Sequence, residues 1–236
     1  AVIRNGEVAH LSAKGKADIQ RDIDMTEDSI FRLYSMTKPI TSIALMSLYE
    51  DGLFQLTDPV SRFIPAWKDL AVYVAGSYPD FETQPVDREM NIQDLLTHQS
   101  GLTYGFFADM PGSTTSVQQA YKELDLGMTD VFPPTLEDLV DKLATLPLEF
   151  SPGTAWNYSV STDVCARLVE VISGRTFDKF LAEVIFEPLG MRETSYEVSD
   201  QLLPRFTVNY KPSMGSGLEV YQDSHGSRYS DPVTHF

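Results

Sequence analysis

The chain of 236 residues has one cysteine, Cys165, and few basic side chains. A single cysteine excludes a disulfide within the chain. Because Cys165 lies in the mostly apolar stretch VCARLVEVI, we interpret it as a buried core residue rather than a thiol nucleophile. The 18 lysines and arginines are outnumbered by 34 aspartates and glutamates, giving a net charge of −16. Nonspecific binding to nucleic acid or to anionic membranes requires a basic surface, so we expect neither partner.

Metal-binding motifs and long apolar runs are also missing. No CxxC or HExxH occurs, and the four histidines are scattered, which argues against a structural zinc site. No apolar run approaches the ~20 residues that span a bilayer. We therefore expect no metal, no cofactor and no membrane insertion. A hydrophobic content of 42% and 13 phenylalanines nevertheless supply ample material for a packed core.

Local patterns predict a helix-rich body with β-structure at its edges. The Asn5-Gly6 pair is a strong two-residue turn signal, so residues 1–19 are expected to form a hairpin. Apolar residues at helical spacing predict helices over 39–50, 91–97, 136–146, 162–172 and 177–186. The patterns at 208–210 and 219–221 indicate strands, and 104–127 is expected to be an irregular insertion.

A serine and a lysine stand at the start of the first expected helix, in FRLYSMTKPITSIALM. Ser35 and Lys38 are three positions apart, so on a helix their side chains share one face. Ser35 is then either a helix cap beside a surface charge or a nucleophile. In the second case Lys38 activates Ser35, because serine alone is a poor nucleophile. Two fixed residues recur by chance, so the spacing leaves both interpretations open.

Tyr158 follows a Pro-Gly turn in SPGTAWNYSV, just before another expected helix. It is either an aromatic core residue with a bonded hydroxyl or a phenol that moves protons at the serine. Sequence spacing does not choose between these two roles.

Five segments resemble one family. FRLYSMTKPIT, DGLFQLTDPVSRFIPAW, LLTHQSGL, FSPGTAWNYS and LVEVISGRTFDKFLAEVIFEPLGMRET are together similar to the serine β-lactamase and penicillin-binding-protein superfamily. Within it the chain looks most like the class C β-lactamase-like branch that includes family VIII carboxylesterases. The resemblance implies Ser35 as the acylated nucleophile, Lys38 as its activator and Tyr158 as the general base.

Two departures from the family pattern bear on the substrate and on the extent of the chain. Two positions after the tyrosine, β-lactamases of this branch usually have an asparagine that holds the substrate amide, and here Val160 is apolar, which favours esters. The family's third motif, KTG-like in lactamases and variable in esterases, supplies a second oxyanion N–H. It does not occur before Phe236. We therefore expect the chain to be part of a longer polypeptide, incomplete at both ends.

Three further aromatic features have less specific interpretations. We favour a hydrogen-bonded structural role for His98, because a lone histidine makes no triad and no G-x-S-x-G elbow occurs. Trp156 is expected to pack beneath the tyrosine loop. The aromatic residues Tyr104, Phe106 and Phe107 either line an acyl pocket or form a small satellite core.

Together these inferences predict an α/β (α+β) fold of the β-lactamase/transpeptidase type, with an antiparallel sheet flanked by helices and a mostly helical region. Residues 1–236 are expected to be part of one catalytic domain. In it, 1–34 begin the sheet region, 35–200 are mainly helical, and 201–236 return towards the sheet. The expected function is cleavage of a small-molecule carboxylic ester through an acyl-enzyme.

Three alternatives stay open. The same side chains suit a β-lactamase or D-peptidase, and they suit an acyltransferase. A non-catalytic sensor with the same fold is the third. The resemblance also implies a bacterial cytoplasmic or periplasmic location.

Overall fold

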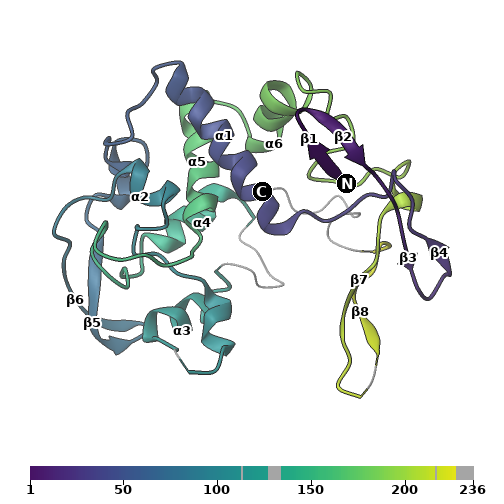
Figure 1. The fold of residues 1–236 in the computed structure, drawn as a ribbon. Coiled ribbons are helices and arrows are strands. Elements are labelled where there is room, and N and C mark those ends of the chain that lie inside the picture. The colour runs from purple at the N-terminus through teal and green to yellow at the C-terminus, as the bar shows by residue number, and fades with distance from the viewer. Residues whose placement is uncertain (113, 127–133, 216, 227–236) are drawn as a thin grey trace. The chain divides into compact units, whose positions relative to one another are not determined.

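The computed structural model describes residues 1–112, 114–126, 134–215 and 217–226 (Figure 1). The chain divides into two compact units. Unit 1 comprises the described residues of Ala1–Tyr34 and Met191–Val233, and unit 2 comprises those of Ser35–Gly190. The expected return towards the sheet beyond residue 226, and residues 113 and 127 of the expected insertion, lie outside the described residues.

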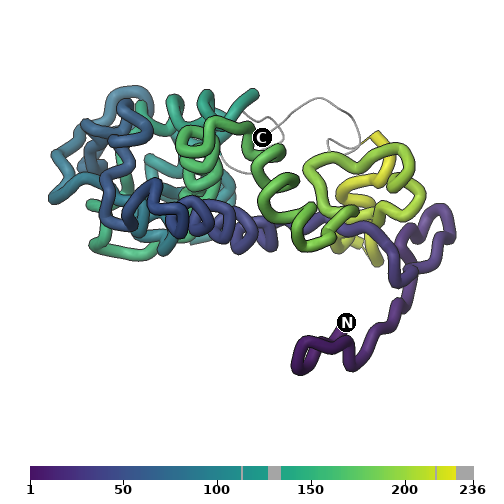
Figure 2. The backbone as a smooth tube through the Cα atoms, turned by 90° about the horizontal axis from the view of Figure 1, so that it is seen from above, coloured from purple at the N-terminus to yellow at the C-terminus, as the bar shows by residue number. Residues whose placement is uncertain are grey.

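Unit 2 is built around helices that pack through their apolar faces. They are α1 (Thr37–Glu50), α2 (Ile92–Leu96), α3 (Ser116–Glu123), α4 (Leu136–Leu143), α5 (Ser161–Ser173) and α6 (Phe177–Phe180), followed by a π-helical turn, Leu181–Phe186. Helix α5 contacts α1, α2 and α4 (Figures 1 and 2). Leu45 on α1 and Leu168 on α5 are fully buried, and each such side chain contributes about 1.5–3 kcal/mol.

Capping residues explain where these helices begin and end. The Asn91 side chain accepts a hydrogen bond from the Asp94 N–H at the start of α2, and Asp94 bonds back to Asn91. Thr135 caps α4 through the Asp138 N–H. Gly174 has a φ of 69° and ends α5 in a left-handed conformation that glycine adopts without strain. The predicted helices are therefore confirmed, with ends that differ by a few residues.

Two features of unit 2 depart from the sequence-based predictions. The segment expected to be an irregular insertion contains α3, which Thr115 and Gln118 begin with a reciprocal capping box. That prediction was wrong there because the composition of the whole segment was weighed above its capping residues and above the short apolar face of Val117, Ala120 and Tyr121. Strands β5 (Ala71–Ser77) and β6 (Asp80–Pro85) form an antiparallel hairpin that the sequence analysis did not predict.

Unit 1 contains short antiparallel strand pairs. They are β1 (Val2–Arg4) with β2 (Glu7–His10), β3 (Lys16–Asp18) with β4 (Ile23–Asp24), and β7 (Asn209–Pro212) with β8 (Leu218–Gln222). The predicted turn at Asn5-Gly6 is confirmed, with φ values of 52° and 80°. The predicted strands near 208–210 and 219–221 are confirmed as β7 and β8. With β5–β6, the described strands form four separate two-stranded sheets.

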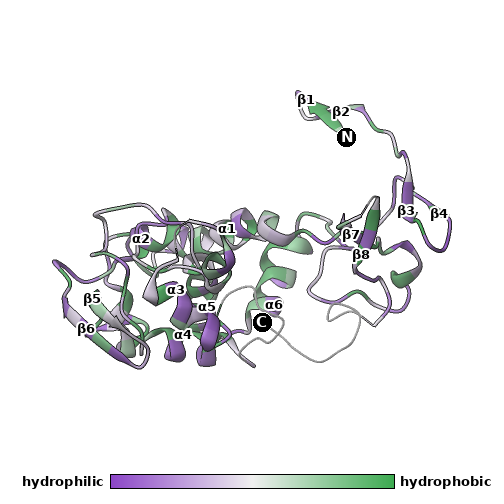
Figure 3. Ribbon diagram, turned by 90° about the horizontal axis from the view of Figure 1, so that it is seen from below, coloured by the Kyte–Doolittle hydropathy of each residue, from purple (hydrophilic) through white to green (hydrophobic). Residues whose placement is uncertain are grey.

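The strands of the first hairpin are exposed along their whole length. Val2, Ile3 and Val8 each expose more than half of their surface, at 55%, 69% and 63%. Apolar colour on β1 and β2 is visible in Figure 3.

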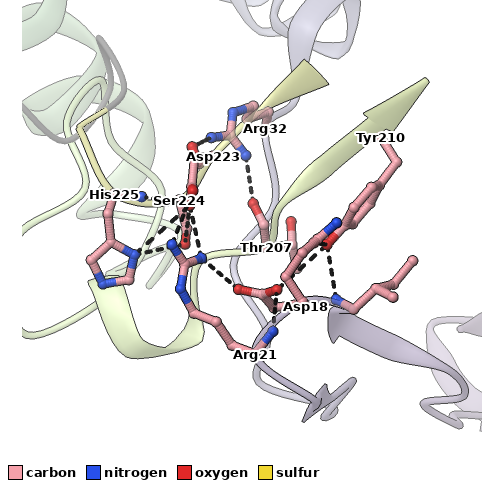
Figure 4. A network of polar contacts seen from close by, with 10 residues as sticks. Asp18, Arg21, Arg32, Thr207, Tyr210, Asp223, Ser224 and His225 are labelled. Carbon is pink, nitrogen blue, oxygen red and sulfur yellow. Dashed lines mark hydrogen bonds and ion pairs between the residues drawn. The ribbon is translucent and has the colours of Figure 1, made fainter. Parts of the chain in front are cut away.

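A polar network joins distant segments within unit 1 (Figure 4). The Arg21 guanidinium donates two hydrogen bonds to Asp223, at 2.8 and 2.9 Å, and one to buried Asp18, at 2.6 Å. Arg32 donates to the backbone carbonyls of Thr207 and Asp223. Residues near 20 and near 220 are thus held together by charged groups rather than by an apolar core.

Candidate active site

Ser35 lies in a 3₁₀ turn, Tyr34–Met36, immediately before α1. Tyr34 has a φ of 46°, an uncommon conformation for a residue other than glycine, so the chain turns sharply just before the serine. The Ser35 hydroxyl is exposed, as a group that reacts with an external substrate must be. Lys38 in the first turn of α1 directs its ammonium Nζ at Ser35 Oγ, 3.3 Å away.

Tyr158 contacts the same hydroxyl from another segment of unit 2. Its phenolic oxygen lies 2.8 Å from Ser35 Oγ, and Lys38 Nζ lies 4.8 Å from the centre of its ring. The three residues that the sequence singled out are therefore brought together, although 123 positions separate Ser35 from Tyr158. A hydroxyl between an amine and a phenol has two neighbours able to take part in removing its proton.

Aromatic rings surround the amine and the phenol. The Tyr104 ring lies 5.5 Å from the Tyr158 ring and 5.6 Å from Lys38 Nζ. Burial raises the pKa of Tyr104 well above its ordinary value, so Tyr104 stays a neutral phenol. Phe106 and Phe107 extend this cluster, with ring centres 5.1 and 6.0 Å from that of Tyr104. Because both phenylalanines are only half-buried, the cluster continues from the candidate site towards solvent.

His98 also packs against Tyr158, with 4.9 Å between ring centres. Its Nδ1 lies 3.4 Å from the Ser159 hydroxyl, and its backbone carbonyl accepts from the Asn157 N–H at 2.9 Å. Burial lowers the pKa of His98, and the positive charge of Lys38 lowers it further. The predicted hydrogen-bonded histidine is therefore present, and it contacts the residues on both sides of Tyr158.

Trp156 corrects one expectation. It does not pack beneath the tyrosine loop: 66% of its surface is exposed, and its ring lies 6.3 Å from that of His98. The reason is local, because Thr154 and Ala155 before it also lie on the exposed side of the turn, whereas the inward positions begin at Asn157.

Asn157, next to Tyr158, and Glu149, which Asn157 binds, were not assigned a role from sequence. Asn157 donates through Nδ2 to the Leu102 carbonyl at 3.0 Å and to Glu149 at 2.8 Å. Burial raises the pKa of Glu149, whose other carboxylate oxygen accepts from Thr115 at 2.6 Å. The only sequence signal was an isolated acid in the apolar stretch LPLEF.

Other candidate groups behave as ordinary core or surface residues. Cys165 is buried as predicted, and burial raises the pKa of its thiol. Val160, the position where the family's lactamases usually have asparagine, is also buried, at 1% exposure. Among the described residues, no cluster of three or more histidine, cysteine, aspartate or glutamate side chains is arranged to hold a metal ion. In the same part of the chain, no helix is long and apolar enough to cross a membrane.

Comparison with known families identifies the fold. The sequence matches the Beta-lactamase family over residues 1–232. The chain belongs to the Beta-lactamase family. Its mixed helices and small antiparallel sheets accordingly represent the β-lactamase/transpeptidase-like fold, as the sequence predicted.

Relatives of this Beta-lactamase family chain include two named esterases. It is 32% identical over 233 residues to esterase EstB of Burkholderia gladioli, covering 96% of the chain and 55% of EstB. It is 34% identical over 190 residues to lovastatin esterase of Penicillium rubens, covering 79% of the chain and 44% of that esterase. The chain spans about half the length of the curated relatives it matches.

A solved structure is similar as well. EstCE1, described as a hydrolase with promiscuous acyltransferase activity, superposes with a TM-score of 0.77 at 25% identity. The match covers 94% of the chain and 53% of EstCE1.

Proposed function

We infer that the protein is a serine hydrolase that cleaves carboxylic esters of small molecules through an acyl-enzyme. The observation that carries this proposal is the position of Ser35 Oγ, 2.8 Å from the Tyr158 hydroxyl and 3.3 Å from Lys38 Nζ. Two groups that exchange protons thus contact one exposed hydroxyl. The two esterase relatives support the same reaction class.

The proposed first step forms the acyl-enzyme. Ser35 Oγ attacks the carbonyl carbon of the ester, and its proton passes to the pair formed by Lys38 and Tyr158, which accepts it when one of the two is deprotonated, as an amine or a phenolate. The Ser35 N–H, just ahead of α1, would be one donor to the oxyanion, where the positive end of the helix dipole also acts. The bond to the alcohol then breaks, and the alcohol leaves with a proton from Tyr158.

The proposed second step releases the acid. Water attacks the carbonyl carbon of acyl-Ser35 and transfers a proton to Tyr158. When the bond to Ser35 breaks, the serine oxygen takes a proton back and the hydroxyl is restored. No redox partner is required, because the reaction exchanges one acyl acceptor for another.

Val160 and the aromatic cluster favour an ester over a lactam. Val160 is buried and apolar, so it offers a substrate amide no donor or acceptor. Phe106 and Phe107 present half-buried rings beyond Tyr104, a surface suited to an apolar acyl group.

A covalent serine probe tests the proposal. A fluorophosphonate should add once to the wild-type protein by intact mass, and Ser35→Ala should gain no adduct. Ser47→Ala is the matched control, because Ser47 lies on α1, the helix that follows Ser35, with its hydroxyl bonded to the Ala44 carbonyl at 2.7 Å. Equal labelling of wild type and Ser35→Ala would overturn the assignment.

Substrate preference separates the ester from the lactam. A short-chain nitrophenyl ester should be turned over faster than a chromogenic cephalosporin. Fast cephalosporin turnover with poor ester turnover would replace the esterase by a β-lactamase.

Acyl transfer to an alcohol is the second candidate, favoured by the described activity of EstCE1. Added alcohols should then divert product from the free acid to a new ester. A product that stays entirely free acid would exclude this second activity under those conditions.

A further inference from the structure

A chain of buried hydroxyl groups runs behind Tyr158. Ser159 Oγ lies 2.7 Å from Ser161 Oγ, and Ser161 Oγ lies 2.7 Å from Ser100 Oγ. One end of this hydroxyl chain reaches His98 Nδ1, 3.4 Å from Ser159 Oγ. At the other end, Ser100 Oγ accepts from the Leu102 N–H at 3.2 Å.

All three serines have 0% exposure in unit 2, although serine is a polar residue. A buried hydroxyl is unfavourable unless it is hydrogen-bonded, and alanine would fill nearly the same space without that requirement. Ser100, Ser159 and Ser161 satisfy one another only in this arrangement. The hydroxyl chain therefore specifies how the segments carrying His98, Tyr158 and the start of α5 fit together.

The acceptors available at its two ends fix the direction of the hydroxyl chain. Ser100 Oγ already accepts from Leu102, and Ser159 Oγ accepts from the Ser161 N–H at 3.4 Å. If each hydroxyl donates onward, from Ser100 to Ser161 to Ser159, every hydroxyl proton has an acceptor. The opposite direction leaves the Ser100 proton without an acceptor among the bonds of the described residues.

The direction determines the state of His98. The last hydroxyl, that of Ser159, must donate to His98 Nδ1, so Nδ1 carries no proton and the neutral ring has its proton on Nε2. Adding a proton to Nδ1 would remove the last acceptor of the hydroxyl chain. It would also place a second positive charge near Lys38.

His98 connects the hydroxyl chain to Tyr158 in three ways. Its ring packs on the Tyr158 ring, its carbonyl binds the Asn157 N–H, and its Nδ1 faces Ser159. The side chain and backbone of His98 therefore contact residues 157, 158 and 159. His98 itself has a φ of 56°, an uncommon conformation that these contacts stabilise.

We propose that His98 and the hydroxyl chain of Ser159, Ser161 and Ser100 are positioning residues that hold the Tyr158 phenol on Ser35 only while His98 is neutral. This inference rests on the proposed function, because it assigns a role to the support of the proposed base. It makes turnover dependent on pH on the acid side, since protonation of His98 releases Ser159 and shifts Tyr158.

Charged and titratable groups near His98 differ in their effect on its charge. Lys38 on α1 also lies near the Tyr158 ring, and its charge opposes a positive charge on His98. Tyr104 is a neutral phenol beside Tyr158. Asp163, on the first turn of α5, interacts with Lys38. The low pKa of His98 keeps the ring neutral at neutral pH.

One matched pair of variants tests the hydroxyl chain. Asparagine tolerates positive φ and can present an acceptor oxygen near the place of Nδ1, but it lacks the ring that packs on Tyr158, so His98→Asn should lower kcat at neutral pH by ~10-fold or less with little change in KM. It should also lose the acid limb that we expect in the pH profile of the wild type. Ser159→Ala should lower kcat at least ~10-fold with little change in KM, because a small displacement of a proton-transfer group is costly.

Controls separate positioning from general stability. Ser47→Ala should keep wild-type kcat, and urea denaturation should show that Ser159→Ala remains folded. An acid limb unchanged in His98→Asn, or wild-type kcat in Ser159→Ala, would overturn the inference while leaving the proposed function intact. Absence of turnover in the wild type, or equal turnover in Ser35→Ala, would instead overturn the proposed function.

One measurement does not require activity. The ¹⁵N chemical shifts of the His98 ring report which nitrogen carries the proton. A proton on Nε2 at neutral pH is expected, and a proton on Nδ1 would overturn the inference whatever the substrate.

Discussion

The two units of the chain are stabilised by different interactions. Unit 2 buries apolar side chains from α1, α2, α4 and α5 around a common core. In unit 1 the described residues that are both apolar and buried are Ala17, Phe206 and Val208. Its distant segments are joined instead by Arg21 and Arg32, whose hydrogen bonds reach carboxylates and backbone carbonyls.

This difference explains why the candidate site lies where it does. A hydroxyl, an amine and a phenol must keep their separations within a few tenths of an ångström to exchange protons, and packed helices hold side chains to that tolerance. Ser35, Lys38 and Tyr158 are all attached to segments that the core of unit 2 supports. Two-stranded sheets such as those of unit 1 are marginally stable on their own, so charge pairs contribute a larger share of the stability of that unit.

The largest expected effect tests whether unit 2 carries the chemistry. Lys38→Ala and Tyr158→Phe should each lower ester turnover between ~10²- and ~10⁴-fold, the range for loss of acid–base assistance. Tyr73→Phe is the control, because it removes a phenolic hydroxyl that donates to the Gly76 carbonyl elsewhere in unit 2. Steady-state kinetics with a nitrophenyl ester would measure both. A near-wild-type rate in either variant would contradict its assigned role.

The second prediction concerns the core that supports the site. Leu45→Ala should lower the free energy of unfolding by about 2–5 kcal/mol, because it opens a cavity at a fully buried position of α1. Ile43→Ala, on the same helix but 58% exposed, should change it by less than about 0.5 kcal/mol. Urea denaturation followed by helical circular dichroism measures both changes. Equal losses in the two variants would show that the core is not where we place it.

Sequence alone predicted the local parts of this arrangement and few of the distant ones. Ser35 and Lys38 were paired because helical spacing puts them on one face, whereas Tyr158 required the family resemblance. The hydroxyl chain was not predictable, because its bonds join residues 61 positions apart and serine is a common residue. Trp156 was misplaced because a turn's exposed side depends on what the rest of the chain covers.

The third prediction turns to unit 1. Arg21→Ala leaves the buried carboxylate of Asp18 without its cation, which should lower local stability by about 1–3 kcal/mol. Hydrogen exchange should become faster at amides of β3, β4, β7 and β8. Amides of α1 and α5 should be unaffected, because they belong to the apolar core. Faster exchange throughout both units would show that the chain opens as a single body.

The last and smallest effect is an opposite dependence of the two units on pH. Hydrogen bonds from Arg21 hold the pKa of Asp223 below its ordinary value. Burial of Asp18 acts to raise its pKa, but bonds from Arg21 outweigh it and lower that pKa too. Groups with lowered pKa stabilise the folded state above their unfolded pKa of ~3.9, and this stability is lost as the pH falls through the folded values. Unit 1 should therefore weaken in acid.

The pKa of Asp163 in unit 2 shifts in the opposite direction. Burial raises its pKa to about 6, although the charge of Lys38 opposes the shift. The contribution of Asp163 to stability is complete below the unfolded pKa of ~3.9 and is lost as the pH rises through about 6. Unit 2 should therefore weaken over that pH interval. Opening free energies from hydrogen exchange at α5 should show this decline in wild type but not in Asp163→Asn. Because the substitution keeps the shape of the side chain, a decline that persists in Asp163→Asn would assign the titration to another buried acid, with Glu149 the first to examine, since burial raises its pKa as well.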